Sequence, residues 1–334
     1  MLQRKVDLYW QTLRYLRPVQ IYGRLWFQIA RPQPELSAPP RLRVPSGVWV
    51  SPAARRPSLT GPGTFFLLNA IGNLDNDGWI NPARDRLWLY NQQYFDDLNA
   101  AAASERLDWH RALIADWIAH NAPGHGCGWE PYPTSLRIVN WVKWALAGYE
   151  LSVEAIHSLA IQARWLMRRL EWHLLGNHLF ANAKALIFAG LFFDGPEAKC
   201  WRDKGVAILL REVPEQILPD GGQFELSPMY HALAVEDVLD LINLTRRFEA
   251  TISSQERCLA AMLSDRVVPM IDWLQVMCHP DGEIALFNDA AMGIAPTPTE
   301  LLAYDDRLGL AAADKKEMTR WLVDFHPELS RLGG

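Results

Sequence analysis

Charged residues are shared unevenly among the helical segments of this 334-residue chain, and this limits its fold more than any other feature. Periodic apolar residues broken by Gly, Pro and Asn predict helices over 105–120, 134–149, 153–173, 177–193, 197–213, 228–248 and 255–278. In order, the first six hold 5, 2, 5, 1, 7 and 5 Asp, Glu, Lys and Arg residues. The second and fourth are apolar all round, so each must be buried on every side.

Helices with a charged face therefore alternate with helices that need burial, and the loops between them are short. Neighbouring helices joined in this way run antiparallel, so the buried helices run parallel to one another. We predict an all-α fold: an incomplete α/α toroid of helical hairpins. Its inner helices should present their N-termini on one common face.

The first 64 residues predict a separate unit, an amphipathic helix and an extended arm, before a toroid of catalytic type over 65–334. Residues 31–64 are rich in Pro, Gly, Ser and Arg, which excludes long helices. Between 65 and 100 the pattern is irregular and indicates loops. The helix should pack on the main domain, although binding at a membrane surface is an alternative. Its apolar residues are Tyr9, Leu13, Leu16, Ile21, Leu25 and Trp26.

Composition argues against several classes of protein. The net charge of −5 comes without a basic stripe, so we expect no nucleic-acid partner. No apolar run approaches the roughly 18 residues of a membrane span. The basic N-terminus does not resemble a cleavable signal peptide. The sequence by itself therefore indicates a cytoplasmic protein. The four cysteines show no CxxC spacing, so neither a zinc ribbon nor a disulfide scaffold is expected.

Polar residues open three of the inner helices. Arg137 lies near the start of the segment at 134, Asn177 and His178 begin the segment at 177, and Tyr230 and His231 follow a Ser-Pro start at 227. Helix N-termini carry partial positive charge and free N–H groups, so this rim should favour an anion such as a sugar carboxylate. The aromatic residues that could stack on such a sugar are Trp129, Tyr132 and Trp172.

Each rim residue also has a structural interpretation. Asn177 could cap its helix, His178 could be an interior histidine, and Tyr230 could pack through its ring. Arg137 could pair with an acid such as Glu130 or Glu225. The functional interpretation is favoured because all four fall on one predicted face.

Other chemistries have weaker support in the sequence. There is no HExxH motif, no Gly-rich phosphate loop and no GxSxG elbow, so we expect no metal and no cofactor. A glycoside hydrolase needs two carboxylates beside the scissile bond. That alternative stays open because acids lie in loops near the predicted rim, namely Glu130, Asp220, Glu225, Glu283 and Asp289.

Four stretches make the sequence similar to a known family. They are WEPYPTSLRIVNWVKW, LEWHLLGNHLFANAKALIFAGLFF, PDGGQFELSPMYHALAVEDVLDLINL and PDGEIALFNDAA, which resemble the N-terminal toroid of heparinase II/III-like polysaccharide lyases over about 65–310. The stretch LRPVQIYGRLWF resembles members found with bacterial exopolysaccharide genes. The resemblance implies β-elimination of a uronic-acid-containing polysaccharide, such as a glycosaminoglycan or an alginate-like polymer, in the periplasm or cell envelope.

Members of this family normally continue into a β-sandwich that adds a His or Tyr to the cleft. No all-β run of that length is present here, so the expected partners are an acidic polysaccharide and a separate β-sandwich domain or subunit. The alternative is a protein of exopolysaccharide production that binds acidic polysaccharide without cleaving it.

The resemblance also implies roles for single residues. Asn177 would neutralise the uronate carboxylate with help from His178, because removing the weakly acidic C5 proton requires stabilised charge. Tyr230 would be the catalytic acid, or both base and acid if a helix N-terminus and His231 depress its pKa. The residues expected to contact substrate are Arg137, Trp129, Tyr132, Trp172, Glu225 and His231.

Overall fold

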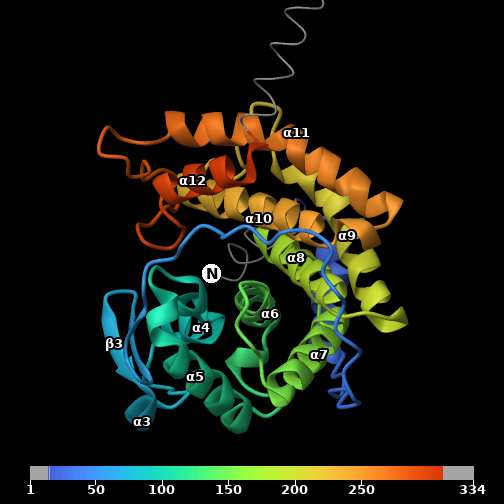
Figure 1. Ribbon diagram of the computed structural model, residues 1–334, viewed down its shortest axis with the longest axis vertical. Coiled ribbons are helices and arrows are strands. Elements are labelled where there is room, and N and C mark those ends of the chain that lie inside the picture. The colour runs from blue at the N-terminus through green and yellow to red at the C-terminus, as the bar shows by residue number, and fades with distance from the viewer. Residues whose placement is uncertain (1–13, 15, 311–334) are drawn as a thin grey trace, which may run out of the picture.

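The computed structural model describes residue 14 and residues 16–310, most of them helical (Figure 1). One small antiparallel sheet, in the order β1-β2-β3, accompanies the helices. The strands are β1 (Leu59–Gly61), β2 (Thr64–Leu67) and β3 (Ala70–Asn73). The helices are α2 (Pro18–Ile29), α3 (Leu74–Asp77), α4 (Arg86–Tyr94), α5 (Leu107–His120), α6 (Pro131–Leu146), α7 (Val153–Arg168), α8 (Gly176–Phe192), α9 (Pro196–Gln216), α10 (Pro228–Arg247), α11 (Ser254–Val276) and α12 (Pro298–Leu308).

The helices form an incomplete α/α toroid, which confirms the predicted fold class. Helix α6 packs between α4 and α8, and α10 packs between α8 and α12. The inner layer therefore contains α6, α8 and α10. Burial separates the two layers: 14 of 17 residues are buried in α8 and 13 of 16 in α6, against 4 of 14 in α5 and 7 of 23 in α11. The uneven distribution of charge in the sequence therefore separates inner from outer helices.

Helices α8 and α9 approach each other closely at two glycines. A Cβ on Gly190 would lie 2.6 Å from the carbonyl oxygen of Ala198, and one on Gly205 would lie 2.6 Å from that of Ala183. Any larger residue at either position would push the two helices apart, because core atoms have little room to move.

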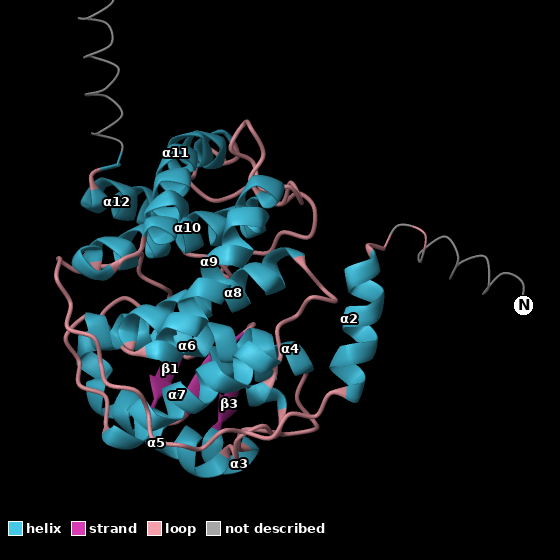
Figure 2. Ribbon diagram, turned by 90° about the vertical axis from the view of Figure 1, so that its right-hand side faces the viewer, coloured by secondary structure: helices cyan, strands magenta, loops and turns pink. Residues whose placement is uncertain are grey.

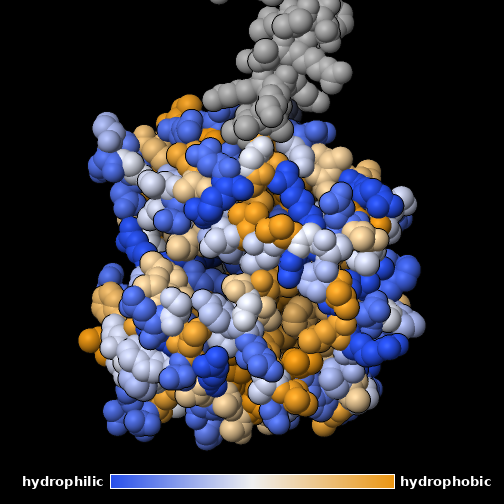
Figure 3. Space-filling view, viewed as in Figure 1, coloured by the Kyte–Doolittle hydropathy of each residue, from blue (hydrophilic) through white to orange (hydrophobic). Residues whose placement is uncertain are grey.

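An extended arm over residues 30–57 crosses the C-terminal ends of the inner helices. The N–H of Arg43 donates to the carbonyl of Phe192 at 2.9 Å, and the N–H of Gly47 donates to that of Arg247, also at 2.9 Å. The last carbonyls of a helix lack partners within the helix, so the arm satisfies groups that would otherwise be unpaired. Figure 3 views the face crossed by the arm, where polar and apolar side chains are mixed.

Charged side chains lie between the inner helices, deep in the toroid. Lys143 of α6 is 2.9 Å from a carboxylate oxygen of Asp240, and Lys184 of α8 is 2.7 Å from the same oxygen. Lys143 also pairs with Glu236, Lys184 with Asp237, and Arg55 of the arm with Glu236. Burial opposes ionisation of Asp240, but the two lysines hold its pKa below the usual value. We call this set the axial ion network: Arg55, Lys143, Lys184, Glu236, Asp237 and Asp240.

The structure differs from the sequence prediction in several places. The irregular stretch after residue 65 contains the sheet and α4, because short strands and a nine-residue helix leave little periodicity to detect. Helix α6 begins three residues earlier than expected, because Pro131 and Pro133 are tolerated in a first turn. Helix α7 ends at Arg168, five residues early, and the chain then turns into α8.

Helix α2 lies on the side of the molecule opposite the arm (Figure 2). It contacts the main body at Gly23, next to Trp172, and at Phe27, whose ring centroid is 4.4 Å from that of His173. Leu25 and Trp26 were expected to pack, but they are 56% and 68% exposed. Ile21 is 43% exposed as well. Tyr9 and Leu13 lie outside the described residues.

Among the described residues, no helix has the length and apolar character needed to cross a membrane. The same part of the chain contains no group of three or more His, Cys, Asp or Glu side chains placed to hold a metal ion. The division of the chain into domains at residue 64 stays a prediction.

Candidate functional site

The N-terminal ends of α6, α8 and α10 lie together, and we call this surface the mouth of the toroid. Asn177 and His178 stand at the second and third positions of α8, and Tyr230 stands at the third position of α10. All three side chains are partly exposed. The Asn177 amide and the Tyr230 hydroxyl make no hydrogen bond within the described residues. Both groups are therefore free to bind a ligand.

The His178 ring is held in place by a chain of hydrogen bonds. Its Nδ1 lies 3.2 Å from Oε1 of Glu171, a residue only 6% exposed. The amide of Asn182 donates to the other oxygen of Glu171 at 3.0 Å and to the hydroxyl of Ser135 at 3.1 Å. Since Nδ1 is engaged by the carboxylate, Nε2 is the ring nitrogen left for a ligand.

Tyr132 joins His178 to Tyr230 across the mouth. Its ring centroid is 4.5 Å from that of His178, and its hydroxyl interacts electrostatically with that of Tyr230. Burial raises the pKa of Tyr132, so this phenol stays protonated. The ring of Tyr132 from α6 and the ring of His178 from α8 thus form one wall of the mouth.

The loop before α10 closes the mouth on the side of α8. Oε1 of Glu225 would lie 3.9 Å from a Cβ on Gly176, the residue before Asn177, and the Glu225 carboxylate interacts electrostatically with Tyr230. Gln216 also donates to the carbonyl of Gly176 at 3.0 Å. Asn177, Glu225 and Tyr230 therefore lie in the same neighbourhood, although their helices are about 50 residues apart in sequence.

Burial raises the pKa of Tyr230, and the nearby carboxylates of Asp289 and Glu225 raise it further. The sequence led us to expect that His231 and a helix N-terminus would depress this pKa. That expectation was wrong, because His231 is neutral and turned into the core. A phenol with a raised pKa is a proton donor at neutral pH.

The backbone is strained at several positions around the mouth. Leu175, Leu226 and Asp289 adopt positive φ angles of 61°, 54° and 64°, which non-glycine residues rarely do. Asn288 ties two of these segments together by donating to the carbonyl of Leu226 at 3.2 Å. Such strain gathers at functional sites, where surrounding contacts hold it in place.

Two predicted contact residues lie in the core instead of the mouth. Arg137 is 0% exposed, and its guanidinium donates to the carbonyl of Gly128 at 2.8 Å and to the side chain of Gln162 at 2.9 Å. It also lies over the Trp117 ring, 3.9 Å from the centroid. Trp129 is 3% exposed, and its indole N–H donates to a backbone carbonyl. The prediction failed because both belong to the packing of α6 against α5 and α7.

Two more predicted contacts point elsewhere. His231 is 0% exposed, since its Nδ1 accepts from the N–H of Gln223 and its Nε2 donates to the carbonyl of Met270. Burial lowers the pKa of His231 to about 4. Trp172 is partly exposed but faces α2, where it lines a separate pocket. The mouth therefore keeps Tyr132, Asn177, His178, Glu225 and Tyr230 from the predicted set.

The five acids proposed for a hydrolase differ in the ion pairs and hydrogen bonds that their carboxylates make. Both oxygens of Glu130 accept from Arg86, and Glu283 pairs with Arg56 at 3.1 Å. Asp220 accepts from the N–H of Gly222 in an exposed turn. Asp220, Glu225 and Asp289 have no ion pair in the described residues, and of these three Glu225 and Asp289 interact with Tyr230.

Sequence reasoning missed Glu171 and Asn182, which position His178. Glu171 was assigned to the charged face of a helix that in fact ends at Arg168. Asn182 is a buried amide in the apolar helix α8. A lone amide in such a helix needs a partner, so Asn182 was the one signal available for this contact.

Known proteins share part of this sequence. Residues 111–299, which are 189 of the 334 residues, match the family described as Heparinase II/III N-terminus. A heparin-sulfate lyase of Bacteroides stercoris is 34% identical over 118 residues, which cover 35% of this chain and 17% of that protein. One from Pedobacter heparinus is 35% identical over 97 residues, covering 27% of this chain and 15% of that protein. The matches thus span less than a fifth of either relative.

Solved structures of similar proteins are more distant. A heparan sulfate lyase mutant from Pedobacter heparinus gives a TM-score of 0.47 at 22% identity, covering 68% of this chain and 38% of that chain. A heparinase III gives a TM-score of 0.48, also at 22% identity, covering 73% and 42%. The family match extends over more than half of the sequence, so this protein belongs to the heparinase II/III family through its N-terminal domain.

Proposed function

We propose that this protein acts on a uronic-acid-containing polysaccharide by β-elimination at the mouth of the toroid. Asn177 and His178 would bind the substrate carboxylate, and Tyr230 would protonate the leaving oxygen. One observation carries the proposal. The Asn177 amide and the Tyr230 hydroxyl, at the N-termini of α8 and α10, make no hydrogen bond within the described residues, and they lie beside His178, which is held by a buried carboxylate. Membership of the heparinase II/III family supports the same reaction.

The chemistry requires groups of this kind. A base removes the proton on C5, negative charge moves onto the adjacent carboxylate, and the C4–O bond then breaks to leave an unsaturated uronate. Donors aimed at the carboxylate lower the barrier because they bind the charged transition state more strongly than the ground state. The Asn177 amide and the N-terminus of α8 supply such donors.

The raised pKa of Tyr230 supports its role as the acid in this scheme. A protonated phenol can give its proton to the departing glycosidic oxygen as the C4–O bond breaks. The base that accepts the C5 proton is either a histidine or Tyr230 itself after ionisation. The pH dependence of cleavage in the Tyr230→Phe variant separates these two assignments.

The direct test is to incubate the protein with heparan sulfate, hyaluronan and alginate and to follow ultraviolet absorbance. An unsaturated product absorbs and a hydrolysis product does not, so rising absorbance with each cleavage supports β-elimination. The Tyr230→Phe variant is the matched control, because it keeps the ring and loses only the phenolic oxygen.

New reducing ends without absorbance would instead assign the protein to the hydrolases. Glu225 and Asp289 are the acids to test in that case, because they lie beside Tyr230 and are not spent in ion pairs among the described residues. Calorimetric binding of these polymers with no cleavage, even after addition of a β-sandwich domain from a relative, would favour a binding protein.

A further inference from the structure

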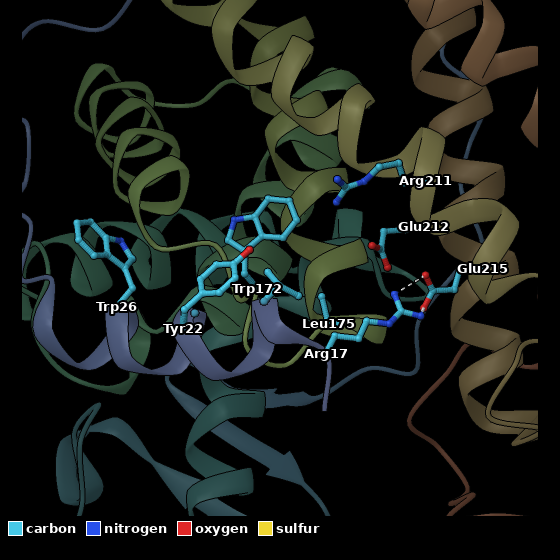
Figure 4. A pocket seen from close by; sticks show the side chains of 10 residues that line it. Arg17, Tyr22, Trp26, Trp172, Leu175, Arg211, Glu212 and Glu215 are labelled. Carbon is cyan, nitrogen blue, oxygen red and sulfur yellow. Dashed lines mark hydrogen bonds and ion pairs between the residues drawn. The ribbon is translucent and has the colours of Figure 1, made fainter. Parts of the chain in front are cut away.

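A pocket lies between α2 and the main body, on the far side of Leu175 from the mouth. Its volume is about 620 Å³, inside the range of about 300 to 1,000 Å³ for small-ligand sites. Tyr22 and Trp26 of α2 face Trp172 across it, and Arg211 and Glu212 of α9 stand at the other end (Figure 4). The pocket therefore combines aromatic walls with a charged edge.

The charges at that edge are not all neutralised. Arg17 pairs with Glu215 at 2.7 Å, and Glu212 accepts a hydrogen bond from Gln216 at 2.9 Å, so both acids are engaged. Arg211 stands over the Trp172 ring, 5.4 Å from its centroid, and makes no ion pair in the described part of the chain. Lys204 stands 5.2 Å from the same ring, also without an ion pair there. Arg211 is therefore the cation of the pocket lining that has no ion pair in the described part of the chain.

The pocket is also connected to the mouth. Leu175 lines it and directly precedes Gly176 and Asn177. Gln216 bridges the two sites, because its amide donates both to Glu212 in the pocket and to the carbonyl of Gly176 at the start of α8. The mouth and the pocket are therefore adjacent, with Leu175 and Gln216 between them.

We infer that this α2 pocket is a second subsite for the acidic polysaccharide bound at the mouth, holding sugar units distant from the scissile bond. A pyranose ring offers apolar faces to Tyr22, Trp26 and Trp172, which bury large area at little entropic cost. Its carboxylate or sulfate reaches Arg211, whose planar guanidinium suits a bidentate contact. The inference rests on the proposed function for the identity of the polymer.

The exposed apolar residues of α2 would also suit a membrane surface. The structure favours the sugar, because Tyr22 and Trp26 line a concave site that also holds Glu212 and Glu215. A concave site of this size can enclose a sugar ring, whereas a flat lipid surface would contact only its rim.

The first test uses the charge. Arg211→Glu is compared with Lys199→Glu, which makes the same charge change on α9 at an exposed ion pair with Asp203. The probes are size-fractionated heparan sulfate oligosaccharides, from disaccharide to decasaccharide, measured by calorimetry. We expect Arg211→Glu to weaken binding of the decasaccharide by about tenfold to a hundredfold, the range for one charge-assisted hydrogen bond, and Lys199→Glu to leave it near wild type. An equal loss in both variants, or no loss in either, would overturn the inference.

The second test uses the aromatic wall. Trp26→Ala removes a ring that is 68% exposed, so folding should be spared, and Phe66→Ala removes a ring that is 47% exposed on β2 as the control. Trp26→Ala should weaken decasaccharide binding and Phe66→Ala should not. Binding of wild type to phosphatidylglycerol vesicles that Trp26→Ala abolishes, with unchanged oligosaccharide affinity, would assign α2 to a membrane and refute the subsite.

Turnover distinguishes a failed subsite from a failed function. If both proposals hold, Arg211→Glu raises KM for long chains, leaves kcat unchanged, and has no effect on the shortest oligosaccharide that is cleaved. A KM penalty that is the same at every length would overturn a distant subsite. If the wild type forms no unsaturated product yet Arg211→Glu still weakens binding, the subsite stands and β-elimination fails.

Discussion

The inner helices carry polar side chains in two regions that the structure uses in opposite ways. In the axial ion network, Lys143, Lys184 and Asp240 are buried and every charge has a partner. At the mouth, Asn177 and Tyr230 are partly exposed, and their polar side-chain groups have no partner within the described residues. Tyr230 and Asp240 lie on the same helix, ten residues or about 15 Å apart.

The axial ion network therefore stabilises the toroid, whereas the polar groups at the mouth are available to bind a ligand. Buried charges that lose a partner destabilise strongly, whereas exposed polar groups contribute little to folding. Changes in the axial ion network should therefore lower stability, and changes at the mouth should lower activity with stability preserved.

Asp240→Asn should have the largest effect. The carboxylate accepts from Lys143, Lys184 and the hydroxyl of Tyr304, so neutralising it removes one of the two carboxylates paired with each buried lysine. We expect the free energy of unfolding to fall by about 3 to 5 kcal/mol in urea titrations. Asp203→Asn, on the exposed side of α9, is the control and should change it by less than about 1 kcal/mol. An Asp240→Asn protein as stable as the control would contradict the structural role of the network.

Tyr230→Phe should have the opposite profile. The rate of cleavage should fall by about 10² to 10⁴, the usual share of general acid catalysis. Stability should change by no more than about 0.5 kcal/mol, because the hydroxyl has no hydrogen bond among the described residues. Tyr149→Phe, where the ring packs on Trp144 away from the mouth, should keep full activity. Near-wild-type turnover in Tyr230→Phe would show that the mouth is structural.

Asn177→Ala should reduce kcat by about 10² to 10³ and also raise KM, since the amide would bind the carboxylate in both ground and transition states. The melting temperature should hardly move. Helix α8 has Leu175 as its N-cap and no side-chain cap, so Asn177 does not have the capping role that its sequence position also allowed. A large drop in stability with unchanged kinetics would restore that structural interpretation.

His231 allows the smallest and most local test, because it follows Tyr230 but faces the core. Burial lowers the pKa of His231 from 6.5 to about 4. Between these two pH values the histidine is protonated in the unfolded chain and neutral in the folded protein. Stability from this group is complete above pH 6.5 and is lost as pH falls toward 4, by up to about 3 kcal/mol. His231→Gln cannot titrate, so its unfolding free energy should lack this part of the acid dependence. Identical pH profiles in urea titrations would contradict the assignment.

Some features of the site could be predicted because they depend on neighbours in sequence. The low charge of the segments at 134 and 177 was enough to place them inside the toroid, and short loops then put Asn177 and Tyr230 at the same end. The roles of Arg137 and His231 could not be predicted in this way. Both lie one or two turns from the helix start, yet a difference of one residue along a helix turns a side chain by about 100°.

The sequence by itself determined the layers of this protein, because hydrophobic periodicity and charge are local properties of each helix. It also determined its family, through motifs that lie within single segments. Only the tertiary structure decided which polar groups of the described residues have a hydrogen-bond or ion-pair partner and which do not. Arg55 and Glu236 are 181 residues apart, and Lys143 and Asp240 are 97 apart, so their pairing depends on how the helices close around the axis. The pKa of Tyr230 and the pocket beneath α2 depend on contacts of the same long range.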